Sequence, residues 1–595
     1  MDAFEEWFRS NGGYLHPSIQ LAQDAEQGSH FQASAVIEPG THVLTVPHNL
    51  AMSNLNAQVD DDFPVFRTHA QQFTVEGLSF FYLMAQWLNK DKSFWKPYLD
   101  ILPSPERGFE TPMFYDEDDR QWLEGTDLYP TLLGREAAWT KYWEDGVQVM
   151  KSAGVDVTNY TCQHWTAYKH GPNGTQTVLL NHNDYPEDWK KFSVLFPAID
   201  IGNHNPNARV DWAYDPDCFS LTVSEKIESG SQVYNNYGPK SSEELLMGYG
   251  FCAPNNPYDG LLLAMRPPPP PLQQMLSITH PEYFKESGEW NSEAATFRLL
   301  HAKLQETNDA SPFDQAWGCV PAPLAELFCY VVQLERGLDV APTEDAEEYL
   351  YHGEGRRYLP RIALYIMMSL IPKISKLEEA NEKLPSAPTN HRQASTKIYR
   401  DLQYEVINSV QERMANYLKD LQPEEVSSDA GSAVWTFEDA VDLLELEMPA
   451  AHKSFMSGVK YVTGTTKLRR LRGSEHEEYL WTILLCFLYL ACTSQTAAPG
   501  LISQWIQSLV AEYGEPDLQA STSDDDETDE EAAEYLDRVK KAAMFLPGSL
   551  WTSEAWSADF VLDFGMRISK SQGTYMDIGD EEVGEDVRYV VYLHV

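Results

Sequence analysis

The sequence has little positive charge for its length. Its 595 residues include 44 lysines and arginines against 90 aspartates and glutamates, which gives a formal net charge of −46. A field of this sign repels phosphate backbones, so direct binding of nucleic acid is not expected. The same field attracts a basic protein partner, less strongly as salt rises, and it also keeps a protein soluble. The composition therefore leaves two readings open, a basic partner or plain solubility.

Metal ligands and disulfides have little support in the sequence. None of its seven cysteines forms a CxxC pair, and the histidines of NHND (181–184) and NHNP (203–206) lack partner ligands at metal spacing. A zinc cluster and a disulfide framework are therefore not indicated, and no metal site is expected. Several cysteines lie in apolar runs such as TILLCFLYLAC, which is typical of buried, reduced thiols in the cytoplasm or nucleus.

The sequence also lacks a leader and a long apolar run. Residues 1–17 open acidic and amphipathic, without the basic start and apolar core of a signal peptide. The most apolar stretch, Tyr479–Cys492, covers about 14 residues, whereas a membrane-spanning helix needs roughly 20. We expect this stretch to be a buried helix in a soluble protein of the cytoplasm or nucleus.

Common nucleotide and hydrolase motifs are missing as well. The chain has no GxxxxGK[ST] loop, no GxGxxG opening a βαβ unit, no HExxH and no GxSxG. The P-loop, Rossmann, zinc-protease and α/β-hydrolase sites are therefore unsupported.

What the sequence does have is a pattern of strands interrupted by helices in its first 255 residues. Residues 31–53 are rich in β-branched side chains and contain a Pro-Gly pair, which predicts two strands around a tight turn. Apolar residues at helical spacing then predict a helical insertion over about 75–190. Residues 191–204 and 218–238 return to strand-like runs. We expect an α+β fold, with a domain over 1–255.

The rest of the chain reads as mostly helical. RPPPPPLQQ (266–274) predicts a stiff extended connector over 256–275, with a ligand for a proline-binding domain as the alternative. A helical C-terminal domain is expected over 276–595, with an acidic loop at 521–531 that runs into a helix. Its clearest helical patterns cover 294–306, 358–384 and 395–422, and VRYVVYLHV is a last strand-like piece.

Two segments rich in asparagine, glycine and tyrosine follow each other in the first domain. They are AIDIGNHNPNARVDW (198–212) and VYNNYGPKSSEELLMGYGF (233–251). Each alone is typical of a turn, and aromatic residues near a strand end usually pack in a core. An asparagine amide, however, is both donor and acceptor, which suits an adenine edge or a neighbouring strand. Their closeness in the chain favours one shared ligand site.

In order and spacing, these segments resemble the signature segments of the SET-domain protein methyltransferases. The class in question contains the Rubisco large-subunit lysine methyltransferase, its fungal ribosomal-protein relatives and the actin-histidine methyltransferase. An Asp-x-x-Asn-His pattern is matched by Asp200, Asn203 and His204. The second pattern is matched, with Ser242 where asparagine is usual, by Tyr237, Gly238, Ser241, Leu245, Leu246, Tyr249, Gly250 and Phe251. SFWKPYLDILP and WLEGTDL resemble the family's insertion, and STKIYRDLQYEVI resembles a helix of its substrate-binding domain.

The resemblance implies a SET β-fold in which one segment threads through a loop of another. It implies S-adenosyl-L-methionine as the cofactor and Tyr237 as the catalytic residue. A buried, neutral phenol suits this role, because methyl transfer depends on aligning reacting atoms held about 3 Å apart. The cofactor-binding residues that it implies are Gln27, Gly28, Ser29, Asp200, Asn203, His204, Tyr237, Tyr249 and Phe251.

The chain departs from the family pattern in two places. Where the family has Glu-Gly-x-Gly-Leu, this sequence has Gln27, Gly28 and then His30 at the second glycine. Before Asn181 it has TVLLNHN, without the arginine that contacts the cofactor's carboxylate in relatives. Both departures bear on cofactor affinity.

Three functions follow from these observations. The first is methylation of a lysine side chain in a basic protein, of the ribosome or the translation machinery. The second is methylation of a protein histidine. The third is a degenerate SET protein that binds a partner and transfers nothing. His30, Ser242 and the missing arginine favour it, and the intact set Asp200, Asn203, His204 and Tyr237 opposes it.

Overall fold

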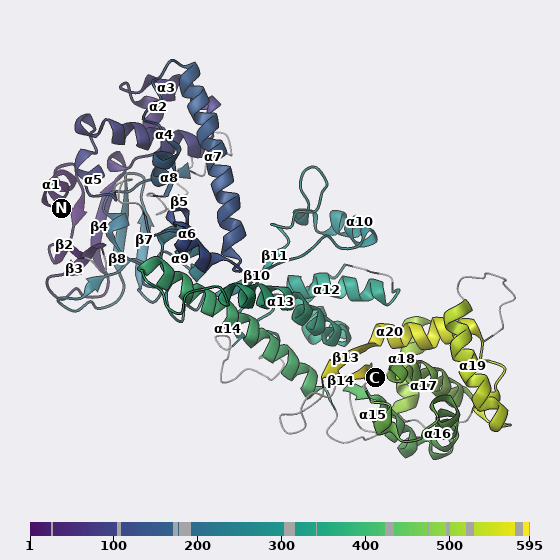
Figure 1. Ribbon diagram of the computed structural model, residues 1–595. Helices are drawn as coiled ribbons and strands as arrows, with labels where there is room; N and C mark the ends of the chain where they lie inside the picture. The colour runs from purple at the N-terminus through teal and green to yellow at the C-terminus, as the bar shows by residue number, and fades with distance from the viewer. Residues whose placement is uncertain are drawn as a thin grey trace. The chain divides into compact units, whose positions relative to one another are not determined.

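The computed structural model of the chain describes residues 1–24, 28–103, 109–170, 176–177, 192–302, 316–338, 340, 342–422, 433–472, 475–494, 500–518, 529–577 and 587–593. It divides into two compact units (Figure 1). Unit 1 contains residues 1–260 and 373–404, and unit 2 contains 261–372 and 405–595. The chain therefore leaves unit 1 after the predicted first domain and returns to it for one helical hairpin.

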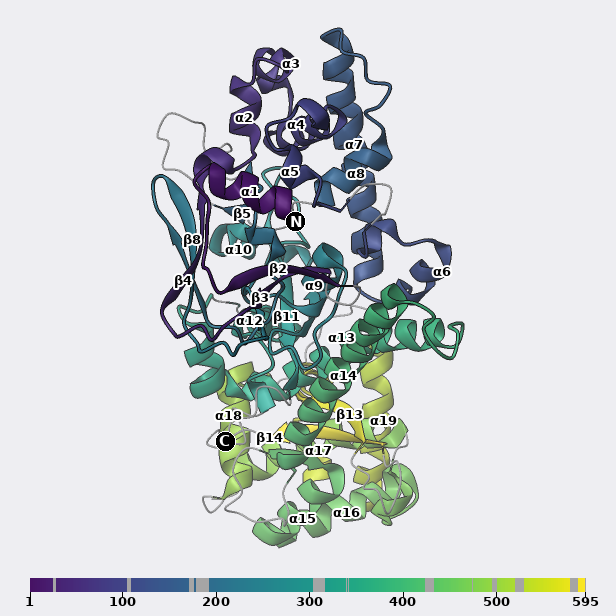
Figure 2. The ribbon, with the colours of Figure 1, turned by 90° about the vertical axis from the view of Figure 1, so that its left-hand side faces the viewer.

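Two antiparallel sheets form the β part of unit 1. The first has the strand order β1 (Tyr14–Leu15), β4 (Thr41–Pro47), β8 (Cys218–Val223) and β7 (Val210–Tyr214), and Figure 2 shows β4 beside β8. The second has the order β2 (Ile19–Asp24), β3 (Gly28–Ala33) and β9 (Gln232–Val233). Strands from both ends of the β domain thus pair with each other. The short β5 (Gln176–Thr177) and β6 (Phe192–Ser193) form a third pair.

The predicted helical insertion is present in unit 1. Its longest members are α4 (Val75–Leu88) and α7 (Leu128–Ser152), which pack so closely that a Cβ on Gly146 would come within 2.0 Å of the Phe81 ring. The other helices of the unit's first 260 residues are α1 (Asp2–Ser10), α2 (Asn54–Val59), α3 (Pro64–Thr68), α5 (Lys96–Leu99), α6 (Glu117–Arg120), α8 (Cys162–His170) and α9 (Ser242–Tyr249). Parts of α13 (Leu359–Asn381) and α14 (His391–Asp420) complete the unit.

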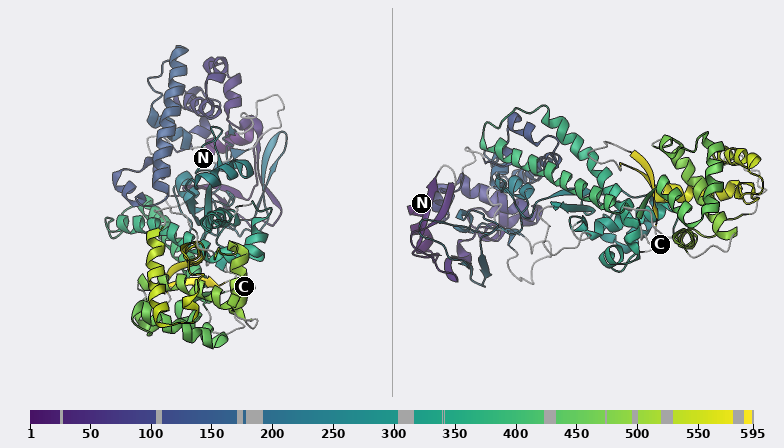
Figure 3. Two further views of the ribbon diagram at one scale, coloured as in Figure 1. Left: turned by 90° about the vertical axis from the view of Figure 1, so that its right-hand side faces the viewer. Right: turned by 90° about the horizontal axis from the view of Figure 1, so that it is seen from below.

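Unit 2 is mostly helical, as the sequence predicts. The C-terminal helices gather around the buried α17 (Glu475–Ser494) and are drawn in green to yellow in Figure 3. They are α15 (Phe437–Glu447), α16 (Pro449–Thr463), α18 (Leu501–Tyr513), α19 (Asp529–Phe545) and α20 (Arg567–Gln572). The unit also has α10 (Pro270–Thr279), α12 (Ala322–Glu335), the pair β10 (Gly260–Ala264) and β11 (Thr296–Leu300), and the sheet β12 (Ala433–Thr436), β14 (Val587–Leu593), β13 (Gly573–Asp577).

The α+β class and the buried helix at Tyr479–Cys492 are confirmed. No helix in the described ranges is long and apolar enough to cross a membrane. Residues 521–528 of the predicted acidic loop lie outside the described residues, and α19 begins at Asp529.

Three local predictions are wrong, each for a physical reason. The proline run does not stay extended, because Pro270 and Pro271 occupy the first turn of α10, where the missing N–H has no helical partner to lose. Residues 296–300 form strand β11 rather than a helix, since pairing with β10 overrides the helical spacing. The run 191–204 is a strand only at Phe192–Ser193 and contains a 3₁₀ turn at Ile199–Ile201.

Candidate functional site

The two asparagine-rich segments cross in unit 1. The Asn235 N–H donates to the Asn203 carbonyl over 2.8 Å, and the Asn205 N–H donates to the Asn235 carbonyl over 3.0 Å. His204 thereby forms a parallel bridge with Asn235. In such a bridge the middle residue turns its own N–H and C=O away from the partner strand. The main chain of His204 has no hydrogen bond to any described residue, so a donor and an acceptor remain for a ligand.

Asn235 and Asn236 hold this crossing, although they were not among the predicted site residues. Asn235 is buried, and its Oδ1 accepts from Trp212 Nε1 over 3.0 Å. Asn236 Nδ2 donates to the carbonyls of Pro206 (3.2 Å) and Ala208 (3.1 Å). The pair therefore ties the second segment to the loop that follows the first. The doubled asparagine before Tyr237 was the available sequence signal.

His204 positions Tyr237 rather than acting as a base. Its Nδ1 accepts the Tyr237 N–H over 3.0 Å, so a neutral ring carries its proton on Nε2. Loss of solvation lowers the pKa of His204, which keeps the ring neutral. The imidazole and phenol rings stack at 4.9 Å between centroids.

Tyr237 is half-buried and held from three sides. Its hydroxyl donates to the Gly202 carbonyl over 3.0 Å, and its ring lies between His204 and Tyr249, the latter at 4.7 Å. Burial, and then the nearby Tyr249 and Asp200, raise the pKa of the phenol well above its usual value. The hydroxyl therefore stays neutral, and because its proton is directed at Gly202, its lone pairs remain available to a ligand.

Tyr249 lies beside Tyr237, and Phe251 lies beside Tyr249 and His204. Burial raises the pKa of Tyr249 to about 12, and the Phe251 ring lies 6.3 Å from that of Tyr249. Both flank Gly250, which ends α9 in the left-handed conformation (φ 82°). A Cβ at Gly250 would lie 2.6 Å from the carbonyl carbon of Glu110. Only glycine fits at this close approach.

Ser242 has a structural role where the family pattern has asparagine. It is fully buried at the start of α9, where its N–H donates to Asp259 Oδ1 over 2.6 Å and its hydroxyl donates to Oδ2 over 2.9 Å. Asp259 is also buried and thus places a carboxylate at the positive end of the helix. Among the described residues, the role of Ser242 is therefore to stabilise the start of α9 rather than to contact a ligand.

Asp200 lies in the 3₁₀ turn beside Tyr237. Tyr98 donates its hydroxyl to Asp200 Oδ2 over 2.5 Å. Solvent reaches the side chain, yet protein atoms crowd the carboxyl group, and the lost solvation raises its pKa to about 6. Asp200 is also one of the charges that raise the pKa of Tyr237, which puts its negative charge within electrostatic reach of the phenol.

The predicted cofactor loop is described only in part. Gln27 lies outside the described residues, as does the segment before Asn181. Gly28 has the left-handed conformation (φ 67°), and Ser29 follows it in β3. His30 is buried, with Nδ1 3.1 Å from the Gly28 carbonyl oxygen.

β3 nevertheless reaches the crossing. Phe31 pairs with Val233, and its ring would be 3.5 Å from a Cβ on Gly202. The structure thus brings together Asp200, Asn203, His204, Tyr237, Tyr249 and Phe251, with β3 alongside; Gly28 and Ser29 make no described contact with them.

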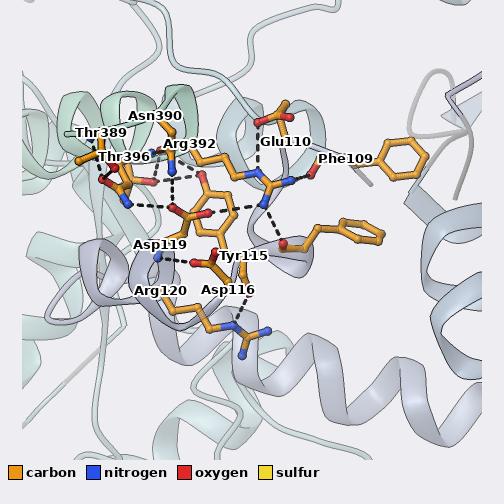
Figure 4. A network of polar contacts seen from close by, with 12 residues as sticks. Phe109, Glu110, Tyr115, Asp116, Asp119, Arg120, Thr389, Asn390, Arg392 and Thr396 are labelled. Atoms are coloured by element: carbon orange, nitrogen blue, oxygen red, sulfur yellow. Dashed lines mark hydrogen bonds and ion pairs between the residues drawn. The ribbon is translucent and has the colours of Figure 1, made fainter. Parts of the chain in front are cut away.

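A polar network fixes the segment that abuts Gly250 (Figure 4). Arg392, in the first turn of α14, donates to the carbonyls of Phe109 (2.8 Å) and Phe114 (3.0 Å) and to Glu110 Oε2 (3.1 Å). The buried Asp119 lies 3.5 Å from Arg392 and accepts from Asn390 Nδ2 (2.8 Å) and Gln393 Nε2 (3.0 Å). The returning hairpin thereby holds Glu110 against the end of α9.

The sequence of the chain is similar to those of known protein methyltransferases. The chain is 23% identical to the ribosomal lysine N-methyltransferase set10 of Schizosaccharomyces pombe over 84% of this chain and 87% of that protein. It is 21% identical to the protein-lysine N-methyltransferase EFM1 of Saccharomyces cerevisiae, over 56% and 61%. It is 23% identical to the actin-histidine N-methyltransferase of Homo sapiens, over 43% and 42%.

Among solved structures, the SET domain of LSMT bound to lysine and AdoHcy matches with a TM-score of 0.50 and 15% identity, covering 70% of this chain and 90% of that chain. No family model matches the chain. The structural match supports the fold alone. The relatives belong to the same class of methyltransferases that the sequence motifs resemble.

Proposed function

We propose that this chain is an S-adenosylmethionine-dependent protein N-methyltransferase. It has the SET fold and resembles SET-domain methyltransferases over most of its length. The observation that carries the proposal is the crossing of residues 203–205 with Asn235, which puts Tyr237 between His204 and Tyr249. S-adenosylmethionine supplies a methyl group on a positively charged sulfur. The chain's own residues supply the binding and the alignment.

The donor groups at the crossing fit this cofactor. The N–H and C=O of His204, which have no hydrogen-bond partner among the described residues, match the donor and acceptor edge of an adenine. The carboxylate of Asp200 suits a positive charge near Tyr237. Tyr237, with its proton given to Gly202, presents oxygen lone pairs without becoming charged. These groups hold and orient, and the half-buried rings around Tyr237 exclude water.

The substrate that we propose is a lysine side chain of a basic protein of the ribosome or the translation machinery. Two observations support it: the S. pombe relative is a ribosomal lysine N-methyltransferase, and the charge of −46 favours encounter with a basic protein. A lysine amine must be unprotonated to accept a methyl group, and burial beside aromatic rings disfavours the ammonium form. Analogy to a relative supports this substrate, and direct identification tests it.

Histidine is a second target, because the actin-histidine methyltransferases match 43% of the chain. The two are separated by chemistry rather than by sequence. Acid hydrolysis of a labelled product and chromatography of the amino acids distinguishes methyllysine from methylhistidine. We expect methyllysine; methylhistidine alone would replace the proposed target.

The degenerate scaffold is the non-enzymatic alternative, favoured by the buried His30 at a usual glycine position. Calorimetric titration of the purified chain with S-adenosylmethionine, and with S-adenosylhomocysteine as a second ligand, tests the cofactor site. We expect both to bind. No heat with either ligand at near-millimolar concentration would favour the scaffold.

A further inference from the structure

Unit 2 contains a pocket of about 760 Å³ that the proposed methyl-transfer site does not use. Its walls come from the end of α12, from residues 342–358, and from the end of α18, all within this unit. Its volume falls within the range of about 300–1,000 Å³ that is usual for ligand sites. The chemistry of its lining indicates what it would bind.

One lining side chain has an unmet hydrogen-bonding need. Gln333 is 7% exposed, and its Oε1 has no hydrogen-bond partner among the described residues. Its amide nitrogen is engaged with the Tyr349 hydroxyl over 3.4 Å. A buried acceptor left without a donor is unfavourable, so the pocket favours an occupant that donates a hydrogen bond.

Negative charge surrounds that acceptor. Glu344, Asp345 and Glu348 line the pocket with exposed carboxylates, and Glu512 adds a buried carboxylate that is already ion-paired with Arg336, whose Nη1 lies 3.2 Å from Glu512 Oε1. The only lining cation in the described part of the chain is Arg357. With Glu512 balanced by Arg336, three exposed carboxylates remain against one lining guanidinium, which makes the pocket attractive to cations.

Arg357 is engaged with Tyr358, another residue of the pocket wall. Its guanidinium donates to the Tyr358 hydroxyl over 2.9 Å and lies 5.0 Å from the centre of the Tyr358 ring. The Arg336 guanidinium lies 4.9 Å from the centre of the same ring. Arg336, Arg357 and Gln572 line a separate cavity of about 20 Å³. In the part of the chain that the structure describes, the Nε atoms of the two arginines and the Oε1 of Gln572 have no hydrogen-bond partner. That cavity has the size for one water, which matches two N–H donors and one acceptor. The unmet arginine donors therefore do not call for an anion in the larger pocket.

We propose that this pocket binds an arginine side chain of a basic protein. A guanidinium donates through several N–H groups in one plane, which suits the Gln333 amide oxygen, the exposed carboxylates of Glu344 and Glu348, and the ring of Tyr349. The inference rests on the proposed function only in naming that protein as the methylation substrate. The pocket would then hold the substrate at a second point, which raises its effective concentration at Tyr237.

The test is fluorescence-anisotropy binding of a labelled peptide, acetyl-Gly-Arg-Gly-Arg-Gly-amide, to the full chain without cofactor. Peptides with lysine or glutamate in place of arginine are the comparison probes. The Glu344→Gln/Glu348→Gln pair removes two rim charges and is expected to weaken the arginine peptide about fivefold. Gln333→Met keeps the side-chain volume, removes the buried acceptor, and is expected to weaken the peptide without lowering the thermal midpoint.

Glu347→Gln is the matched control, because Glu347 is an exposed carboxylate in the same segment that does not line the pocket. We expect it to leave binding unchanged. Equal weakening by Glu347→Gln, equal binding of the glutamate peptide, or no effect of the Glu344/Glu348 pair would each overturn the proposal. Tighter binding of the lysine peptide would overturn the choice of arginine.

The same titration on Tyr237→Phe separates this proposal from the proposed function. If the arginine peptide still binds to Tyr237→Phe, and the wild-type chain binds the peptide but no S-adenosylmethionine, the pocket is upheld and the methyltransferase assignment fails. If the chain transfers methyl groups but the Glu344→Gln/Glu348→Gln pair leaves peptide binding unchanged, the methyltransferase assignment is upheld and the pocket proposal fails.

Discussion

Replacing Gly250 by alanine is expected to destabilise unit 1 by about 2–4 kcal/mol. The left-handed conformation of Gly250 (φ 82°) costs a residue with a Cβ roughly 1–2 kcal/mol. The new Cβ would also meet the Glu110 carbonyl carbon at 2.6 Å and its oxygen at 2.7 Å, and such overpacking costs about 1–3 kcal/mol. The smaller entropy of the unfolded alanine chain offsets about 0.4–1 kcal/mol of this.

Gly248→Ala is the control for the same chemical change. Gly248 is in the last turn of α9, and a Cβ there meets nothing within 4 Å. Alanine in a helix is better than glycine by about 0.5–1 kcal/mol, so this variant should be as stable as the wild type or more so. Scanning calorimetry measures both, and the transition that S-adenosylhomocysteine shifts identifies unit 1.

Arg392→Ala should reduce the cost of the Gly250 substitution. Arg392 holds the main chain at Phe109 and Phe114, so its removal lets Glu110 move away from a new Cβ. The double variant should be more stable than the sum of the two single effects predicts, by about 0.5–3 kcal/mol. Equal stability of Gly250→Ala and Gly248→Ala would refute the close approach; strict additivity with Arg392→Ala would refute the clamp.

Two further perturbations test other parts of the site. Because the pKa of Asp200 is raised to about 6 from an ordinary 3.8, its ionisation opposes folding as pH rises through about 6, so Asp200→Asn should gain stability over the wild type at pH 7.5 relative to pH 5. The ionised Asp200 should also favour the positively charged sulfur of S-adenosylmethionine over the neutral sulfur of S-adenosylhomocysteine. The ratio of the two affinities should therefore rise between pH 5 and 7 in the wild type and stay constant in Asp200→Asn. The same pH dependence in both proteins would argue against a carboxylate near the sulfur. Asp259→Asn should cost about 1–3 kcal/mol in urea unfolding, because the buried carboxylate accepts from both the N–H and the hydroxyl of Ser242. Asp217→Asn, at an exposed carboxylate, should cost nothing measurable, and similar losses in both would contradict the capping role.

Sequence patterns predicted the long helices well. The buried α17 is a continuous apolar run, and the hairpin helices α13 and α14 carry apolar residues at helical spacing over many residues, which local sequence determines. Short elements were less predictable, since tertiary pairing decides them. Residues 296–300 became a strand because β10 lies beside them, and 199–201 became a 3₁₀ turn.

The site was predictable where residues lie close in the chain. Asn203, His204 and Tyr237 stood out by their order, and the structure brings them together. Their supports were not predictable, because the partners are far apart in sequence. Nothing in the spacing of Tyr98 and Asp200, or of Glu110 and Arg392, indicates that they are hydrogen-bonded.

The central claim is that Tyr237 aligns a methyl transfer at the crossing of the two segments. The direct measurement is incubation of the purified chain with S-adenosylmethionine labelled in its methyl group and a cell extract, beside Tyr237→Phe at equal cofactor occupancy. We predict labelling of one or a few protein bands, reduced about 100-fold in Tyr237→Phe. Equal labelling by both proteins, or none by the wild type when the cofactor is bound, would contradict the account.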